Sequence, residues 1–552
     1  MAYYKLVVKI QKNMDVFLVY GAVFITLVIS PFNFDGILLP KMIFLFLFTA
    51  YSMPILLNRL TTSEVSRKQR TLFFLLPLLV LVNFLIIIIA SSAPFEQQIF
   101  GRSGRGLGLI TYFSLIILTL NSIVFIKLSS KRLILKGLVL ASLVSSAYAC
   151  LQRFNLDFTT WDSRTNGIIG TLGNPNFQSS LSALAIVPAF VFFYSHKYRN
   201  ILLPIIIAVL LGSLYFTGST QGYIGVLIAI FVFTLTKVWF VSRKFFYPSL
   251  LFSSIVGAYV GAGMLNYGYF SNYLYKISIQ SRGDFWRSAL ATARDNPIFG
   301  VGLDSFKDYF FLYRDQVAAN HTFAEVADNA HNYYLQFAAT GGFPLALIYV
   351  VFTFYTLYCF IKVITSHGSF DPNITAIFSA WCILQAQSII SPNSIVLLIW
   401  IFILSGAAIS FHVSRDPKNL APNMRKTHSN INILSISCMV IALFISYPQF
   451  RTDRVLFQGL QSKSGDLIIK STTLYPRSET VFNLVGVELL KSNLFPQSLE
   501  VAKRSTQWNP NAVSGWGLIV ANPTATNEER EFARLQVLRL DPLNKEAKKL
   551  KF

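Results

Sequence analysis

A histidine and several arginines in one polar stretch are the side chains of this sequence best suited to proton transfer and anion binding. His331 begins the run His-Asn-Tyr-Tyr-Leu-Gln and stands ahead of the pair Gly341-Gly342. Because an imidazole exchanges a proton near neutral pH, His331 is the candidate general base. Arg282 and Arg314 lie in the same stretch, and a guanidinium suits phosphate oxygens because it stays charged and can bind two of them. The stretch therefore predicts proton transfer beside a bound anion.

Proline and glycine residues predict where the helices of this stretch end. Residues 296–302 read Asn-Pro-Ile-Phe-Gly-Val-Gly, a pattern expected to break the chain between two short helices. The carboxylates of the stretch are scattered rather than paired at ligand spacing, so the sequence gives no reason to expect a metal. We expect no cofactor. His321 has no comparable neighbours and is expected to be a solvated loop residue.

The composition is that of a membrane protein. Of the 552 residues, 53% are hydrophobic and 13% are charged, which a soluble protein of this size could not accommodate. The formal net charge is +22, but most Lys and Arg residues form short clusters between apolar runs, the pattern of charge that sets topology. We therefore expect no nucleic-acid partner. The four cysteines lie in or beside apolar runs without metal or disulfide spacing and are expected to be packing residues: Cys150, Cys359, Cys382 and Cys438.

The apolar runs predict an all-α, polytopic fold with about 13 transmembrane helices, at roughly 20 residues per span. The runs begin near residues 16, 37, 71, 107, 134, 175, 201, 222, 249, 342, 373, 395 and 430. The first run lacks a small-residue cleavage site, so we expect a retained span rather than a cleaved signal peptide.

The short loops between these runs alternate in charge. One set is basic and contains Lys5, Lys9 and Lys12, Arg67 to Arg70, Lys131 and Arg132, Lys197 and Arg199, Arg243 and Lys244, and Arg415 to Lys426. The opposite set carries only Arg102, Arg105, Arg153 and Arg164. The positive-inside rule places the N-terminus in the cytoplasm and the C-terminus outside a cell membrane. The stretch that contains His331 is then extracytoplasmic.

Two extracytoplasmic regions are too long to be simple connectors. We predict a membrane domain over residues 1–447, with a large loop at about 266–340, and a separate tail over 448–552. In the tail, Pro476, Pro510 and Pro542 follow one another at separations near 34 residues in similar contexts, which resembles tetratricopeptide repeats. Such a tail offers a partner or substrate surface without chemistry of its own. The alternative is an ordinary helical tail whose prolines merely stop helices.

The run from Ser281 to Pro344 resembles the signature of the O-antigen ligase and O-antigen polymerase superfamily. It contains an Arg-x-x-x-Trp segment at Arg282 and Trp286, an Asn-Pro-x-x-Gly-x-Gly turn at 296–302, and a His-Asn pair ahead of Gly-Gly. The segment 170–176, Gly-Thr-Leu-Gly-Asn-Pro-Asn, is a further familiar element. The resemblance covers roughly residues 70 to 410.

This resemblance implies a GT-C-like glycosyltransferase that uses neither a nucleotide sugar nor a metal. Such enzymes move a glycan from an undecaprenyl-diphosphate carrier to an acceptor hydroxyl outside the membrane. By the resemblance, His331 would be the base that deprotonates or orients the acceptor. Arg282 would hold the diphosphate, and Asn332, the neighbour of His331, is a further substrate-binding candidate.

The sequence departs from the family at one position. Members often carry a second arginine ahead of a span, and Gln221 occupies the matching place here. A glutamine can hydrogen-bond an oxygen but cannot neutralise a phosphate, so another cation must help. Arg102 and Arg105, in a glycine-punctuated loop, are the first candidates, followed by Arg164 and Arg314.

Several functions remain open at this stage. A ligase, a polymerase of lipid-linked repeat units and a protein O-oligosaccharyltransferase share the donor and differ in the acceptor, which is a glycolipid, a polymer or a protein. Membrane lipid is a partner in each case, and the tail could add a protein partner. A membrane transporter is the more distant alternative. Transporters usually place ionisable groups or broken helices near mid-bilayer, whereas the candidate charged residues of this chain lie in the predicted extracytoplasmic loops.

Overall fold

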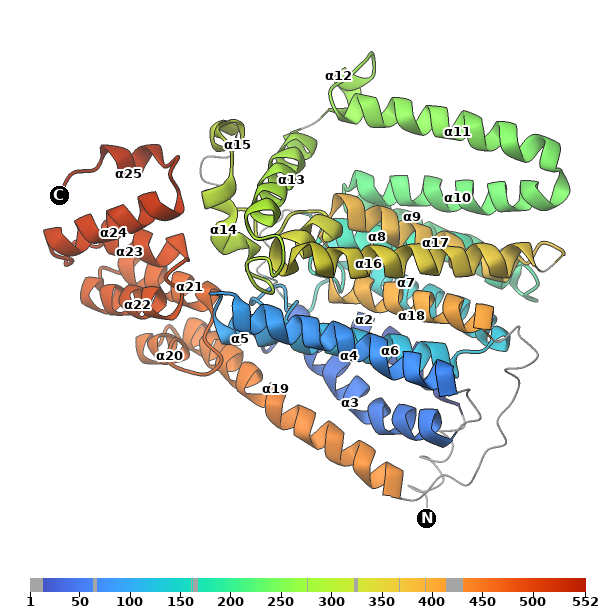
Figure 1. Ribbon diagram of the computed structural model, residues 1–552, viewed down its shortest axis with the longest axis horizontal. Helices are drawn as coiled ribbons and strands as arrows, with labels where there is room; N and C mark the ends of the chain where they lie inside the picture. The colour runs from blue at the N-terminus through green and yellow to red at the C-terminus, as the bar shows by residue number, and fades with distance from the viewer. Residues whose placement is uncertain are drawn as a thin grey trace.

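A computed structural model describes residues 13–62, 67–159, 161, 167–275, 277–321, 326–366, 368–392, 394–413 and 430–552. Regular structure within these ranges is helical, and they contain no strand, which confirms the all-α class. Figure 1 shows long helices side by side, with the helices of the loop and the tail gathered at one end of the bundle. We call this end the loop face. Arg164 and the basic segments 5–12 and 415–426 lie outside the described residues, and the membrane orientation stays a prediction.

Ten helices of the described chain are long and apolar enough to cross a membrane, so the polytopic prediction is confirmed. They are α3 (Leu38–Thr62), α7 (Lys131–Arg153), α8 (Pro175–Phe193), α9 (Arg199–Phe216), α10 (Thr220–Val241), α11 (Arg243–Met264), α16 (Tyr333–Thr365), α17 (Pro372–Ile390), α18 (Ile395–Val413) and α19 (Asn430–Ser462). Shorter apolar segments occur in α2 (Met14–Leu27), α4 (Arg67–Ala90) and α6 (Leu109–Phe125). The count of 13 spans stays a prediction.

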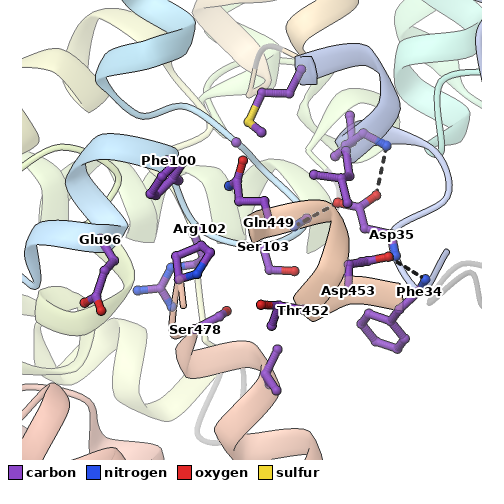
Figure 2. A pocket seen from close by; sticks show the side chains of 18 of the residues that line it. Phe34, Asp35, Glu96, Phe100, Arg102, Ser103, Gln449, Thr452, Asp453 and Ser478 are labelled. Atoms are coloured by element: carbon purple, nitrogen blue, oxygen red, sulfur yellow. Dashed lines mark hydrogen bonds between the residues drawn. The ribbon is translucent and has the colours of Figure 1, made fainter. Parts of the chain in front are cut away.

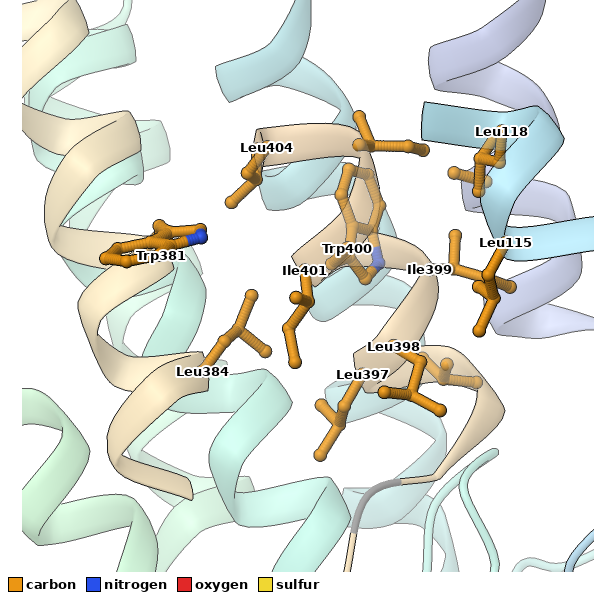
Figure 3. Packing of buried hydrophobic residues seen from close by; sticks show 14 of the residues in the cluster. Leu115, Leu118, Trp381, Leu384, Leu397, Leu398, Ile399, Trp400, Ile401 and Leu404 are labelled. Carbon is orange, nitrogen blue, oxygen red and sulfur yellow. The ribbon is translucent and has the colours of Figure 1, made fainter. Parts of the chain in front are cut away.

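Helix α18 forms the centre of the bundle. Almost all of its residues are buried, which fits a helix that is apolar on every face. Figure 3 shows its Trp400 among aliphatic side chains of α18 and α6. The two buried indoles of this region keep hydrogen-bond partners, since Trp400 donates to the Thr26 hydroxyl at 3.2 Å and Trp381 of α17 donates to the Ser405 hydroxyl at 3.0 Å. Packing around α18 therefore fixes the helices whose ends form the loop face.

The large loop folds into a compact unit on the start of α16. It contains α12 (Ser271–Leu274), α13 (Ile277–Asp295), α14 (Phe306–Tyr313) and α15 (Gln316–His321). Phe285 of α13 and Phe306 and Phe310 of α14 pack in a small core with Ala330 and Ala339. The break between α13 and α14 falls at the predicted Asn-Pro and glycine turn.

The two glycine motifs meet backbone to backbone. Gly342, with φ 76°, kinks α16 at the position where the sequence predicted a span to begin. The amide of Phe343 donates to the carbonyl of Pro297 at 2.8 Å. A Cβ on Gly300 would lie 2.4 Å from the amide nitrogen of Gly341, closer than real Cβ contacts allow. The glycines thus permit the contact that fastens the loop to the helix.

The tail is a series of short helices packed in chain order at the loop face (Figure 1). Helix α19 continues through Pro448, so the predicted boundary at 447/448 falls inside a helix. The following helices are α20 (Gly465–Ser471), α21 (Glu479–Lys491), α22 (Phe495–Trp508), α23 (Val513–Ala521), α24 (Asn527–Leu540) and α25 (Lys545–Lys549). Pro510 and Pro542 come just after the ends of α22 and α24, whereas Pro476 lies further from the end of α20 at Ser471. The tetratricopeptide character and the domain division stay predictions.

Candidate functional site

His331 lies in a tight turn that side chains hold against the start of α16. Its backbone amide donates to the Asn329 side-chain oxygen at 2.8 Å, and its φ of 49° is left-handed. The Asn332 side-chain oxygen caps α16 by accepting from the amides of Tyr334 and Leu335 at 3.0 and 3.1 Å. This side-chain bonding fixes the place of the imidazole before any ligand binds.

The imidazole of His331 is placed to accept a proton. Its centroid lies 5.2 Å from that of the Phe285 ring, and its buried Nδ1 has no hydrogen-bond partner among the described residues. Burial lowers the pKa of His331 to about 4, with Arg105 and Arg282 acting in the same direction against the opposing charge of Asp328. The ring is therefore neutral at pH 7, with a nitrogen available to a ligand.

Asp328 and Arg105 form an ion pair beside His331. The Arg105 Nε donates to Asp328 at 2.9 Å, and Nη2 donates to both carboxylate oxygens at 2.7 Å. Although burial opposes the shift, the charge of Arg105 holds the pKa of Asp328 below its ordinary value. The carboxylate fixes the direction of a guanidinium that comes from a different loop, between α5 (Phe95–Phe100) and α6.

Arg282, which belongs to α13, also lies near His331. Its side chain is half-buried, and burial lowers the pKa of its guanidinium. Its charge acts on the titration of His331, as that of Arg105 does. The structure thus brings together three of the predicted site residues, His331, Arg282 and Arg105.

Arg102 and Arg314 have carboxylate partners in the tail instead. Arg102 is 4% exposed and binds Asp308 at 2.6 Å through Nη2 and Glu479 through Nη1. Arg314 is also 4% exposed, and its Nη2 binds Asp541 at 2.8 Å. Their predicted contact with substrate stays untested, and these buried pairs favour a structural role that joins the loop to the tail.

Gln221 lies in the first turn of α10. Its side-chain oxygen accepts from Gln387 of α17 at 2.8 Å, and its buried Nε2 has no partner among the described residues. The preceding Ser219 hydroxyl donates to Asn176, at the start of α8, at 2.7 Å. Gln221 therefore belongs to a neutral polar group where these helices meet, and its contact with substrate stays a prediction.

Sequence reasoning missed two kinds of residue. Asp328 was one of several scattered carboxylates, although its place three positions before His331 is a local signal that could have singled it out. Glu479 and Asp541 gave no signal, because their partners Arg102 and Arg314 lie hundreds of positions away in the chain. Within the described ranges no group of three or more His, Cys, Asp or Glu side chains could hold a metal ion, and metal independence stays a prediction.

Comparison with known proteins gives two matches. The profile of the family described as O-antigen ligase matches residues 205–350, a segment that runs from α9 into α16. An uncharacterized protein of Haemophilus influenzae is 25% identical over 264 residues, which make up 43% of this chain and 62% of that protein. The chain therefore spans less than two thirds of the length of this relative. The matched family segment contains both His331 and Arg282, and the match supports the resemblance of this chain to the O-antigen ligase superfamily.

Proposed function

We propose that this protein transfers a glycan from an undecaprenyl-diphosphate-linked donor to an acceptor hydroxyl on the extracytoplasmic side of the membrane. One observation carries the proposal. A neutral imidazole, with a buried nitrogen that no described group binds, lies among the charges of two arginines and one carboxylate. This combination suits a reaction that takes a proton from one substrate while it holds the anionic leaving group of another.

His331 takes the proton of the acceptor hydroxyl in this reaction. The hydroxyl oxygen then forms a bond to the anomeric carbon of the donor, and the bond between that carbon and the phosphate oxygen breaks. The electron pair leaves with the lipid diphosphate. A base with a pKa of about 4 is weak at neutral pH. A bound diphosphate offsets the charges of Arg105 and Arg282 and raises the pKa of His331 toward the working pH.

Arg282 and Arg105 hold the diphosphate oxygens. Asp328 occupies Nε and Nη2 of Arg105, which leaves Nη1 as the nitrogen best placed to donate to a phosphate oxygen. Two fixed cations stabilise the charge that grows on the leaving oxygen. Asn332 contributes by fixing the turn, and Arg102 and Arg314 contribute by fixing the loop on the tail. A ligase and a polymerase share these roles and differ in the acceptor.

His331→Ala tests the proposal directly. Transfer from a purified lipid-diphosphate donor should fall by about 10²–10⁴-fold, the usual contribution of a general base. His321→Ala is the matched control, because His321 lies in the same loop and binds Asp284 and Gln280. Full transfer by the His331 variant removes this residue from the mechanism. Glycan profiling of a deletion strain separates the acceptors, since lipid-linked polymer accumulates without a ligase and single units accumulate without a polymerase.

A further inference from the structure

A cavity lies on the loop face, and His331 is not among the residues that line it. Its walls come from the start of α3, the loop between α5 and α6, α19, and the start of α21. Figure 2 shows Gln449, Ser103 and Ser478 grouped on these walls. The α5–α6 loop contributes Arg102 and Ser103 to the cavity, whereas Arg105 of the same loop binds Asp328 beside His331. One loop thus separates the cavity from the reaction site.

Three side chains of the cavity have buried polar atoms with no hydrogen-bond partner among the described residues: the Nε of Arg102 and two neutral groups, on Gln449 and Ser478. The side-chain oxygen of Gln449 is buried and unbonded. The hydroxyl of Ser478 is also buried and unbonded, although Ser478 is the N-cap of α21, where a serine usually bonds its own helix. Because unpaired buried polar groups cost free energy, both side chains suit a place where a ligand supplies the missing bonds.

The charges of the cavity are already paired. Arg102 binds Asp308 and Glu479, and the Nε of Arg477 binds Glu96 at 3.0 Å. Each of these arginines therefore has its charge balanced by at least one carboxylate.

The carboxylates in the walls are occupied as well. Asp453 accepts from the backbone amides of Phe34 and Asp35 at 2.9 and 2.8 Å, and Asp35 accepts from the amide of Leu38 at 2.8 Å. The groups that Gln449 and Ser478 leave for a ligand are neutral, and the Nε of Arg102 adds one donor whose charge is already paired. A hydroxyl matches these groups because it both donates and accepts. Buried Phe100 and Leu456 supply apolar wall, as small-molecule sites usually do.

We propose that this cavity binds one uncharged sugar residue of the acceptor. The assignment of this sugar to the acceptor rests on the proposed function, whereas the binding of a neutral sugar does not. The anionic donor then binds on the side of the α5–α6 loop where Arg105 lies, and the hydroxyl-rich acceptor binds in the cavity on the other side. An acceptor that binds in this way is a glycan rather than a bare peptide.

Binding of methyl glycosides to the full-length protein tests the cavity without turnover. Saturation-transfer NMR with methyl galactoside and methyl glucoside should show binding, and Gln449→Leu and Ser478→Ala should each weaken it about fivefold through the loss of one hydrogen bond. The control is Gln458→Leu, an exposed position of the same helix. Glucuronic acid should bind less well than the neutral glycosides. Equal binding by the wild type and the Gln449→Leu, Ser478→Ala double variant overturns the proposal.

Transfer kinetics then connect the cavity to the reaction. Both variants should raise the KM for the acceptor and leave kcat and the KM for the donor unchanged; a fall in kcat alone argues against an acceptor subsite. His331→Ala should bind glycosides as the wild type does. If His331→Ala still transfers glycan, the proposed function fails while the glycoside result stands on its own, so the two failures are distinguishable.

Discussion

Arg102 and Arg105 lie three positions apart in one loop and have opposite surroundings. Arg102 is almost fully buried between Asp308 and Glu479, and these carboxylates raise the pKa of its guanidinium although burial opposes them. The side chain of Arg105 keeps 18% of its surface exposed and binds one carboxylate, Asp328, beside His331. The two arginines come from the same loop, yet one pairs with a carboxylate of the tail and the other pairs with Asp328 beside His331.

The glycines of the loop account for the difference. Gly101, Gly104 and Gly106 have positive φ values of 79°, 81° and 63°, which let the chain reverse direction between the two arginines. A guanidinium held by two buried carboxylates cannot leave them without a large cost. A guanidinium with one partner and a free edge can still bind an anion. The comparison teaches that the burial and number of the carboxylate pairs, rather than position in the loop, separate the structural arginine from the candidate ligand.

Removal of Arg102 should have the largest effect on stability. Arg102→Ala leaves Asp308 and Glu479 buried without this cation, which should destabilise the protein by about 3–5 kcal/mol. Thermal unfolding of the detergent-solubilised protein measures the loss. Transfer per folded molecule at saturating acceptor should change far less. A variant with wild-type stability would contradict the structural role of Arg102.

Removal of Arg105 should lower transfer and leave the stability of the protein nearly unchanged. Arg105→Ala should lower transfer by about 10²–10³-fold, as when one preorganised donor is lost from an active site. Its melting temperature should stay close to that of the wild type, because the ion pair with Asp328 is partly exposed. Kinetics and thermal unfolding of both arginine variants give the result. If Arg105→Ala unfolds while Arg102→Ala loses only transfer, the assignment of the two roles is reversed.

The pH dependence of transfer should also distinguish the roles of Arg102 and Arg105. Under the proposed function the neutral imidazole is the active form, and burial lowers the pKa of His331 to about 4. The kcat/KM of the wild type should therefore stay high as the pH falls through 6 and decline only near pH 4. Arg105→Ala removes a cation that lowers this pKa and frees Asp328, so the decline should move upward toward the ordinary value of 6.5. Arg102→Ala should move it less, and an equal shift in both variants would contradict the separation.

The sequence predicted the helices and the local motifs of the site better than its long-range partners. Apolar runs predicted the long helices because each run must bury or face lipid along its own length. The glycine motifs predicted the loop break, and α16 is kinked at Gly342, where a span was expected to begin, although the helix itself starts at Tyr333. These features depend on neighbours in the chain.

The roles of the arginines depended on contacts that no local pattern reveals. Arg102 meets Glu479 across 377 positions of sequence, and Arg105 meets Asp328 across 223. From the sequence alone, Arg102 and Arg105 were therefore equal first candidates for the missing cation, and Arg314 came after them. Tertiary packing distinguishes them by giving Arg102 and Arg314 buried partners in the tail and giving Arg105 a partner beside His331.

The smallest effect on stability is expected from a change of Glu479, the partner of Arg102 in the tail. Glu479→Gln keeps the shape of the side chain and leaves Arg102 with Asp308, so the loss of stability should be about 1–3 kcal/mol rather than the larger loss of Arg102→Ala. Burial opposes ionisation of Glu479, but Arg102 and Lys307 outweigh it and lower its pKa to about 2 from an ordinary 4.5. A lowered pKa in the folded state contributes stability that is complete above pH 4.5 and is lost as the pH falls toward 2. Glu479→Gln should flatten this part of the acid unfolding curve.

The matched control for Glu479 is Glu529, whose partner Lys503 lies on the surface of the tail. Glu529→Gln keeps the capping box with Thr526, so only an exposed ion pair is lost and stability should hardly change. Because neither substitution touches Arg105, Asp328 or His331, both variants should keep the wild-type pH profile of transfer. A shift of that profile in Glu479→Gln alone would mean that the tail acts on the base through the α5–α6 loop, and the two arginines would then be parts of one coupled unit.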